Sequence, residues 1–245
     1  MYFTRRLPPK FSSLRLRISP GASLGYYRGL RQAGLNDLYD FAEHHVRPGD
    51  TVWDVGSNMG IFAFAAAARA GLGGRILCVE PDLWSVRLLR RSCSYNRGRA
   101  APVDVLPAAA TGRCGLEWLN IPERSRAATH LESAGGAGPE LVGGVRERLL
   151  TAAITLDWLA ENSAAPRVLK IDVDGAEQAV LAGAAKLLAE QSPVILIEVY
   201  ERNADAVSAL LHERGYTLFD YTGGEAGKRE VARAVYNTLA LPPRS

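Results

Sequence analysis

The feature that most constrains the fold is an alternation of two patterns that starts at Thr51 and continues to the end of the chain. Short runs rich in Val, Ile and Leu are separated by stretches in which apolar residues recur with helical period. The runs predicted as strands are residues 51–55, 75–79, 103–108, 167–173, 193–199, 216–219 and 236–241. The stretches predicted as helices are residues 60–70, 83–95, 155–161, 175–190 and 203–214. This alternation predicts a Rossmann-like α/β fold, a mostly parallel sheet with helices on both faces.

A chain of 245 residues, of which 47% are hydrophobic and 22% charged, can bury one sizeable α/β core. We predict one domain over residues 35–245, which opens with an amphipathic helix over residues 35–45. Residues 1–34 form a basic arm and lead-in, and their first twenty residues are predicted to be irregular. The arm could contact an anionic substrate or a membrane, but a solvated, partly disordered tail is the favoured interpretation.

Cysteine usage indicates a reducing compartment, and the short apolar runs argue against a membrane-spanning segment. Cys78, Cys93 and Cys114 are odd in number and show no C-x-x-C spacing, so neither a disulfide framework nor a zinc site is predicted. The longest apolar run, residues 61–68, is far shorter than the about 20 residues that span a bilayer, and the N-terminus has no apolar signal core. We expect a cytoplasmic protein without stable membrane insertion. The formal charge of +3 is small, and no nucleic-acid partner is predicted.

The segment TVWDVGSNMG, residues 51–60, reads as a buried strand that runs into a turn with two glycines. In open α/β sheets ligands bind beyond the carboxyl ends of the strands, so this turn is the expected cofactor site. The dinucleotide fingerprint G-x-G-x-x-G fails twice, because Asn58 and Ile61 stand at its second and third glycine positions. Asp54 adds negative charge beside the place where phosphates would lie. S-adenosylmethionine, which carries an ammonium and a sulfonium but no phosphate, fits this turn better than NAD does.

Glu80 follows the second predicted strand, in the sequence RILCVEPD. A carboxylate at this point can accept both hydroxyl hydrogens of a cofactor ribose, a device that NAD enzymes also use. Glu80 therefore indicates adenosine without choosing between cofactors. Asp54 and Glu80 could instead be polar strand ends that face water. Two acids at the ends of successive strands, the first entering a Gly-x-Asn-x-Gly turn, favour the binding site.

Five segments, in this order along the chain, resemble the FkbM family of S-adenosylmethionine-dependent methyltransferases. They are VWDVGSNMGIFAFAAA, CVEPD, TLDWL, VLKIDVDGAEQAVLAGA and VILIEVY, and the likeness extends over residues 35–220. The most specific piece is LKIDVDGAE. The resemblance implies a seven-stranded class I methyltransferase fold. It also implies, as is usual in the family, O-methylation of a hydroxyl on a natural product, glycan or glycolipid.

The resemblance also implies roles for particular residues. The residues expected to line the methionine side of the cofactor are Asp54, Gly56, Asn58 and Gly60. Glu80 would hold the ribose, and Asn96 matches an asparagine that the family often has after the second helix. Ser57 and Met59 are mild departures from the residues common in the family. The basic arm and residues 133–144 follow no family pattern, so the resemblance does not name the acceptor.

The fourth and fifth predicted strands carry the candidate catalytic residues. Lys170 and Asp172 point to one face, because strand side chains alternate with a period of two, and Asp172 is expected to emerge beside the cofactor. Glu198 ends the neighbouring strand, so Asp172, Asp174 and Glu198 are expected to gather around one small volume. Methyl transfer requires the acceptor oxygen about 3 Å from the methyl group and a route for its proton. Asp172 or Glu198 could be the general base; these carboxylates could also hold a divalent metal, which is not predicted.

The same polar residues have structural interpretations. Asp174 could cap the helix predicted to start after it. Glu177, in the first turn of that helix, fits an interaction with the helix dipole and solvent, with a role in the site as the alternative. Lys170 must be paired if it is buried, and an ion pair with Asp172 or Asp54 is favoured over proton chemistry.

Residues 133–144, SAGGAGPELVGG, interrupt the alternation and are too rich in glycine for regular structure. The loop predicted here could be a lid over the acceptor or an inert insertion. His130, just before it, is a third candidate base, although a lone loop histidine is more often incidental. Tyr26 and Tyr27 could stack over adenine or the acceptor, or pack in the core.

The sequence therefore predicts a methyltransferase that uses S-adenosylmethionine to methylate a hydroxyl of a secondary metabolite, sugar or glycolipid. The alternatives are N-methylation or carboxylate methylation on the same fold, and a non-catalytic cofactor-binding partner protein. An NAD-dependent oxidoreductase ranks third because of the missing glycines. The expected partner is a small-molecule or glycan acceptor, and a homodimer stays open.

Overall fold

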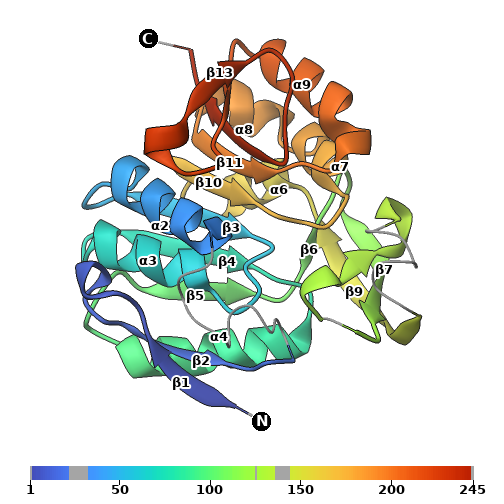
Figure 1. Cartoon of the computed structure of the whole chain (residues 1–245). Helices are drawn as coiled ribbons and strands as arrows, with labels where there is room; N and C mark the ends of the chain where they lie inside the picture. Colours follow the sequence, from blue (N-terminus) through green and yellow to red (C-terminus); the bar gives the residue numbers. More distant parts are fainter. Residues whose placement is uncertain (1, 22–32, 125, 136–143, 244–245) are drawn as a thin grey trace.

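The computed structural model describes residues 2–21, 33–124, 126–135 and 144–243. Its central sheet, within these residues, has eight strands in the order β13-β12-β14-β11-β10-β3-β4-β5 (Figure 1). The strands are β3 (Thr51–Val55), β4 (Arg75–Val79), β5 (Val103–Leu106), β10 (Val168–Ile171), β11 (Val194–Glu198), β12 (Thr217–Asp220), β13 (Arg229–Val231) and β14 (Asn237–Leu241). The seven predicted strands are all present, and β13 is an additional edge strand antiparallel to β12.

The sheet is mostly parallel, which confirms the predicted Rossmann-like architecture. Strands β5, β4, β3, β10 and β11 are parallel, whereas β14 is antiparallel between β11 and β12. The chain extends the sheet in one direction from β3 and in the other from β10, so the strand order reverses between these two neighbours. Ligands of open α/β sheets bind at such a reversal, beyond the carboxyl ends of the strands.

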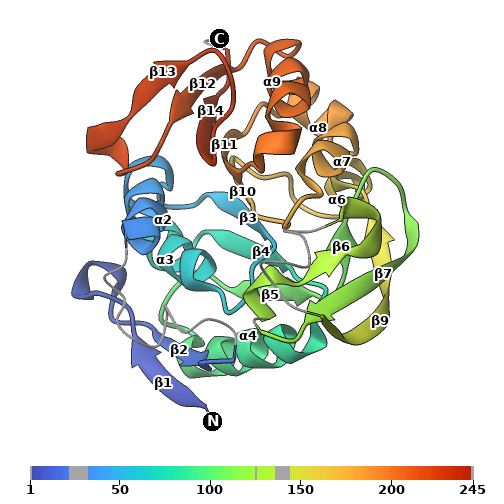
Figure 2. The ribbon, with the colours of Figure 1, turned by 45° about the vertical axis from the view of Figure 1, so that its right-hand side comes forward.

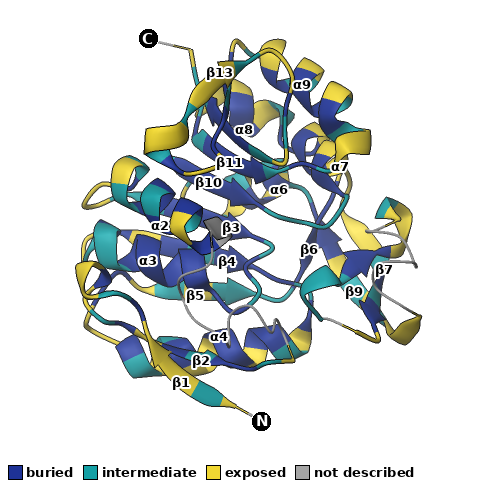
Figure 3. Ribbon diagram, viewed as in Figure 1, coloured by how far each residue is buried: buried dark blue, intermediate teal, exposed yellow. Residues whose placement is uncertain are grey.

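Helices cover both faces of the sheet (Figure 2). One face carries α2 (Ala33–His45), α3 (Ile61–Ala70) and α4 (Leu83–Asn96), and the other carries α6 (Leu156–Asn162), α7 (Glu177–Ala182), α8 (Ala185–Glu190) and α9 (Ala204–His212). Strand β10 is buried over its whole length and β3 and β11 over most of theirs (Figure 3), which is expected for parallel strands covered on both sides, whereas β5 at the edge of the sheet has no buried residue. Among the described helices, none combines the length and apolar character needed to cross a bilayer.

The single helix predicted over residues 175–190 is wrong, because the chain breaks between α7 and α8. A Cβ on Gly183 would lie 2.4 Å from the carbonyl oxygen of Thr111, so the backbone here packs closely on another segment. The carbonyl of Gly183 accepts a hydrogen bond from Asp157 N, and the Asp157 carboxylate accepts one from Leu187 N in α8. Contacts with distant residues therefore stabilise a break that helical periodicity does not reveal.

The prediction of an irregular, solvated start to the chain is also wrong. Strands β1 (Phe3–Arg6) and β2 (Arg15–Ile18) form an antiparallel hairpin with a short 3-10 helix, η1 (Pro9–Phe11), between them. The hairpin lies along α4 (Figure 1). Leu16 and Ile18 are buried while Arg15 is exposed and Arg17 is half-buried, so the segment RLRI has the two-residue alternation of a half-buried strand. The many arginines of this part of the chain made the alternation hard to recognise in the sequence.

A second sheet lies in the part of the chain between β5 and α6, where no strand was predicted. It consists of β6 (Ala109–Ala110), β7 (Gly115–Pro122), β8 (His130–Leu131) and β9 (Val145–Ile154), in the order β6-β9-β7-β8. We call it the inserted sheet; it lies beside the main sheet (Figure 2). Two 3-10 helices, η2 (Arg126–Ala128) and η3 (Glu132–Ala134), flank β8. Of the predicted loop 133–144, residues 136–143 lie outside the described residues, as do Tyr26 and Tyr27.

Candidate active site

The turn after β3 is shaped by residues in the left-handed region. Gly56 has φ +77°, Asn58 φ 50° and Gly60 φ +82°. A Cβ on Gly56 would lie 1.7 Å from the carbonyl oxygen of Asp172, and one on Gly60 would lie 2.5 Å from a methyl carbon of Leu89. Glycine is therefore required at both positions, for conformation and for space. The close approach brings the turn against the carboxyl end of β10.

Asp54 and Lys170 lie beneath this turn, where both are buried. Lys170 Nζ is 3.0 Å from Asp172 Oδ2, 3.6 Å from Asp54 Oδ1 and 3.2 Å from the carbonyl oxygen of Gly56. The other carboxylate oxygen of Asp54 accepts a hydrogen bond from Ala63 N in α3. The predicted ion pair of Lys170 is confirmed, and it involves both of the acids considered.

Burial and the charge of the ion-pair partner shift the pKa values of Lys170 and Asp54 in opposite directions. Burial lowers the pKa of Lys170, but the charges of Asp172, Asp54 and Glu198 outweigh it, so the net shift is upward. Burial raises the pKa of Asp54, and Lys170 opposes that rise. Lys170 therefore stays protonated and partly neutralises acids that would otherwise be buried without a counter-charge.

Glu80 follows β4 and is 6% exposed. Its Oε2 accepts a hydrogen bond from Asn58 N at 2.7 Å, and its Oε1 accepts one from Asp82 N at 2.9 Å. Burial raises the pKa of Glu80 to about 7, against the effect of these two hydrogen bonds. Each carboxylate oxygen has two lone pairs, so Glu80 can still accept hydrogen bonds from a ligand.

Asp174 and Glu177 lie at the turn between β10 and α7. Asp174 does not cap α7, because the N-cap residue is Ala176, and its Oδ1 instead accepts a hydrogen bond from the Tyr200 hydroxyl at 2.7 Å. Glu177 is 1% exposed, so its predicted solvation is wrong. Its carboxylate accepts hydrogen bonds from Gly175 N at 2.6 Å and Asn203 Nδ2 at 2.5 Å. Glu177 thus supports the turn that follows Asp172.

Glu198 ends β11, next to the end of β10. Burial and the charge of Asp172 raise its pKa to about 7, while Lys170 opposes the rise. The nearby Tyr236 hydroxyl lowers the pKa of Glu198, against the effect of burial. The backbone of this tyrosine is fixed as well, since Val199 N donates to its carbonyl oxygen at 2.8 Å. Sequence reasoning missed Tyr236, which no local motif marks.

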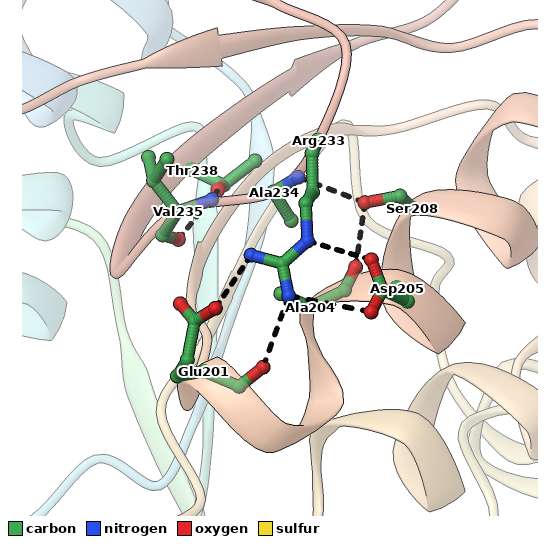
Figure 4. A network of polar contacts seen from close by, with 8 residues as sticks. All are labelled: Glu201, Ala204, Asp205, Ser208, Arg233, Ala234, Val235 and Thr238. Carbon is green, nitrogen blue, oxygen red and sulfur yellow. Dashed lines mark hydrogen bonds and ion pairs between the residues drawn. The ribbon is translucent and has the colours of Figure 1, made fainter.

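A polar network on α9 holds the segment that leads to Tyr236 (Figure 4). Arg233 contacts the carboxylates of Asp205 at 2.6 Å and Glu201 at 2.8 Å. Ala234 N donates a hydrogen bond to the Ser208 hydroxyl at 2.8 Å. The approach of Tyr236 to Glu198 is therefore anchored by contacts outside the site.

Two adjoining hollows lie over these residues. The larger, of about 600 Å³, is lined by Glu80, Asp172 and Asp174 and, from η2 and the residues up to β8, by Arg126, Thr129 and His130. The smaller, of about 350 Å³, is lined by Asp54, Lys170, Asp172 and Glu198. Gly56, Asn58 and Asp172 line both. The expected gathering of acids is thus centred on Asp172, with Asp174 on one side and Glu198 on the other.

His130 lies on β8 rather than in a loop, and it is 9% exposed. Its Nδ1 is 3.0 Å from the carbonyl oxygen of Ala128. His130 therefore faces the larger hollow in a fixed orientation. The segment that leads into β8 also contributes Arg126 and Thr129, which sequence reasoning missed because nothing in the sequence placed the inserted sheet against the site.

Asn96 requires a correction, because the structure places it at the N-terminal hairpin rather than in either of these hollows. Its side-chain amide donates to the carbonyl oxygens of Arg15 and Ser92, and its side-chain oxygen accepts from Arg15 N. All of its polar atoms are engaged in holding β2 against α4. A role in binding the cofactor is therefore not supported.

Within the described ranges, no group of three or more His, Cys, Asp or Glu side chains is arranged to hold a metal ion. The acids of the site are occupied by Lys170, by the hydroxyls of Tyr200 and Tyr236, and by backbone N–H groups. Asn58 differs from them, because its Oδ1 is buried without a hydrogen-bond partner. This acceptor lies where both hollows meet, so it is available to a ligand with a hydrogen-bond donor.

Comparison with known proteins gives a consistent result. The family model for the methyltransferase FkbM domain matches residues 54–218. The ribosomal protein L11 methyltransferase of Pelotomaculum thermopropionicum is 38% identical over 101 residues, which are 40% of this chain and 32% of that protein. The chain thus matches about a third of the length of this curated relative.

Two solved structures share the fold. The methyltransferase FkbM of Methylobacillus flagellatus KT superposes with a TM-score of 0.52 and 16% identity, over 95% of this chain and 58% of the other. The precorrin-6y C5,15-methyltransferase of Geobacter metallireducens GS-15 superposes with a TM-score of 0.50 and 12% identity, over 87% and 90% of the two chains. At these identities the superpositions show only a common fold. The family match shows which methyltransferase family the sequence resembles.

Proposed function

The chain belongs to the FkbM family of methyltransferases, and from this premise we propose that it transfers a methyl group from S-adenosylmethionine to a hydroxyl of a secondary metabolite, sugar or glycolipid. One observation carries the proposal. The turn after β3 places Asn58 against Glu80 on one side, and the close packing of Gly56 on Asp172 brings the candidate bases to the other. A cofactor at this turn would contact both sets of residues.

The donor set fits S-adenosylmethionine. Glu80 would accept the ribose hydroxyls, and the unpartnered Oδ1 of Asn58, together with the acids at Lys170, suits the ammonium of the methionine end. Negative charge at this end would repel phosphates, which argues against a dinucleotide. The cofactor supplies an electrophilic methyl group on its sulfonium, and the protein must position the acceptor and receive its proton.

Glu198 is the base that the electrostatics favour among Asp172, Glu198 and His130. A general base works best with a pKa near the working pH, and the pKa of Glu198 is raised to about 7. Asp172 is held by Lys170 at 3.0 Å, so it suits a role in orienting cofactor and acceptor. We propose that Glu198 receives the proton of the acceptor hydroxyl, with its carboxylate oriented by Tyr236.

The charge of the site also ranks the alternative acceptors. Asp54, Asp172 and Glu198 surround a single cation, Lys170. An acceptor that is itself a carboxylate would be repelled, so carboxylate methylation is disfavoured. An amine would be attracted in its protonated form, which makes N-methylation the second candidate. A non-catalytic cofactor-binding protein would have no use for a base at Glu198.

Calorimetric titration tests the cofactor assignment. We expect binding of S-adenosylmethionine and S-adenosylhomocysteine and no comparable binding of NAD. Glu80→Ala should weaken that binding about 10- to 150-fold, because two ribose hydroxyls lose a charged acceptor. Asp104→Asn, on exposed β5 surface, is the matched control and should leave the affinity unchanged. Tight NAD binding without S-adenosylhomocysteine binding would overturn the proposal.

Transfer of a labelled methyl group tests the acceptor class. Sugars and other alcohols, amines, and carboxylic acids are offered separately with labelled S-adenosylmethionine. We expect label on hydroxyl compounds and none on carboxylic acids. Label on amines alone would replace O-methylation by the second candidate, and binding without transfer to any of the three classes would favour the non-catalytic protein.

A further inference from the structure

Arg126 connects the inserted sheet to the main sheet at the edge of the larger hollow. Its Nη1 lies 2.8 Å from Asp82 Oδ1, and the two side chains are 15% and 3% exposed. Its Nη2 lies 3.3 Å from Glu147, whose side chain is 45% exposed. The guanidinium also lies over the ring of Trp84, 5.1 Å from its centroid. Arg126 is thus fixed by one buried acid, one exposed acid and one aromatic face.

Asp82 belongs to the turn that presents Glu80. Its backbone N–H donates to Glu80 Oε1 at 2.9 Å, so the two acids are adjacent in space as well as in sequence. The Asp82 side chain caps α4, where it accepts hydrogen bonds from Trp84 N at 3.2 Å and the Ser85 hydroxyl at 3.1 Å. These contacts involve no compensating cation. Arg126 supplies one, because a buried carboxylate is otherwise costly.

Arg126 also begins the wall of the hollow that faces Glu80. The segment from Arg126 to Leu131 contributes Thr129 and His130 to the lining, while Glu80 and Ser85 line the opposite side. Thr129 Oγ1 is buried without a hydrogen-bond partner, which leaves a polar atom of this wall available to a ligand. The distance between the two sides of the hollow therefore depends on the contact between Arg126 and Asp82.

We propose that Arg126 is a positioning residue for the cofactor pocket, which it organises by pairing with Asp82 and so holding the 126–131 wall against the turn that carries Glu80. The proposal rests on the proposed function, since it assigns Glu80 to the cofactor. Arg126 does not act on the reacting atoms. It sets the width of the pocket and offsets the negative charge beside Glu80.

The charges around Glu80 make this role measurable. Asp82 raises the pKa of Glu80 and the more distant Lys170 lowers it, while burial is the largest influence and also raises it. The other titratable groups nearby are Cys78 in β4, His130 in the facing wall, and Asp172 and Asp174 after β10. Loss of Arg126 leaves the charge of Asp82 uncompensated, so Glu80 should ionise at higher pH. Neutralisation of Asp82 should let Glu80 ionise at lower pH.

The test measures the dissociation constant of S-adenosylhomocysteine between pH 6 and 9 for four variants. Arg126→Gln should weaken binding about tenfold at neutral pH and move the pH midpoint of binding upward, as expected when one partner of a buried ion pair is lost. Arg126→Lys keeps the charge and should keep the midpoint. Asp82→Asn should weaken binding while it moves the midpoint downward. Glu147→Gln removes only the exposed partner and should remain within about twofold of the original protein.

Circular dichroism and thermal unfolding establish that each variant is folded. If Arg126→Gln does not fold, the opposite midpoint shift in Asp82→Asn and the unchanged midpoint in Arg126→Lys still decide the matter. The inference is overturned if Arg126→Gln binds within about twofold of the original protein at every pH, or if all variants keep one midpoint. If the original protein does not bind S-adenosylhomocysteine, the proposed function itself has failed, and Arg126 has no cofactor pocket to position.

Discussion

The ammonium of Lys170 lies 3.0 Å from Oδ2 of Asp172, which follows it by two positions and lies directly after the end of β10. One short stretch of chain thus provides both an acid of the site and its counter-charge. Asp54 on the adjacent strand shares the same cation at 3.6 Å. The arrangement explains how several acids can lie close together at the end of a buried sheet.

Replacement of Lys170 by methionine should destabilise the protein by about 3–5 kcal/mol, because the buried carboxylate of Asp54 and the partly exposed carboxylate of Asp172 lose their cation. Urea denaturation at pH 8 measures the change. Lys186→Met is the control, since its ion pair with Glu161 is exposed on both sides and its loss should not be measurable. Equal stability of the two variants would show that Lys170 is not the counter-charge of the cluster.

Gly56→Ala should abolish cofactor binding and strongly destabilise the fold. The new Cβ would lie 1.7 Å from the carbonyl oxygen of Asp172, in addition to the cost of φ +77° for alanine. Gly49→Ala is a matched control, because Gly49 has φ +87° and nothing lies within 4 Å of its Cβ position. That variant should lose only about 1 kcal/mol from backbone strain. Thermal unfolding and cofactor titration of both variants separate strain from collision.

Glu198→Gln should reduce single-turnover methyl transfer about 100-fold or more while cofactor affinity stays nearly constant, because the base is lost but the shape is kept. The original rate should rise with pH through about 7, where Glu198 ionises. Asp172→Asn should also slow transfer, and any loss of cofactor affinity with it would place Asp172 in the cofactor pocket.

Glu190→Gln is the control for the Glu198 experiment, since Glu190 is an exposed acid at the end of α8, away from the site. It should transfer methyl at the original rate. Normal turnover of Glu198→Gln would move the base assignment to Asp172 or His130. Assignment of the base to Glu198 therefore requires both the fall in the rate of Glu198→Gln and the pH dependence of the original rate.

The free protein should become less stable as pH rises from about 5 to 8. The pKa values of Glu80 and Glu198 are raised to about 7 in the folded state from the ordinary 4.5. Between these values the unfolded chain releases protons that the folded chain retains, so rising pH favours unfolding. Urea denaturation at pH 5.5, 6.5 and 8 measures the slope. Glu198→Gln should reduce it, and a slope of opposite sign would contradict these shifts.

The main sheet could be predicted from the sequence because its signals are local. Parallel strands covered on both faces are continuous apolar runs, and the acids that end them stand out at their boundaries. Asp54, Glu80, Asp172 and Glu198 therefore lie at the carboxyl edge, where the pattern placed them. The pairing of Lys170 followed from its position within an apolar strand.

The inserted sheet and the N-terminal hairpin could not be predicted in the same way. β7 has exposed Leu116 and Trp118 beside buried Leu119, so its alternation does not separate apolar from polar residues cleanly. Its partner β9 is separated from it by a glycine-rich segment that hides the pairing. Arg126, Thr129 and His130 reach the site only through this sheet, and so no local signal could assign them together. Tyr200, two residues after Glu198 in VILIEVY, could have been predicted from the motif.

The hydrogen bonds between Asn96 and Arg15 have a practical consequence for how the protein is divided. The family match starts at residue 54, yet Phe11, Leu14 and Leu16 are part of the apolar core that contains α3 and α4. A recombinant chain that began at residue 35 or 54 would expose that core to water and remove the hydrogen bonds between Asn96 and Arg15. Such a fragment should accumulate as insoluble aggregate. The stretch that matches the family model is therefore shorter than the stretch that must fold together.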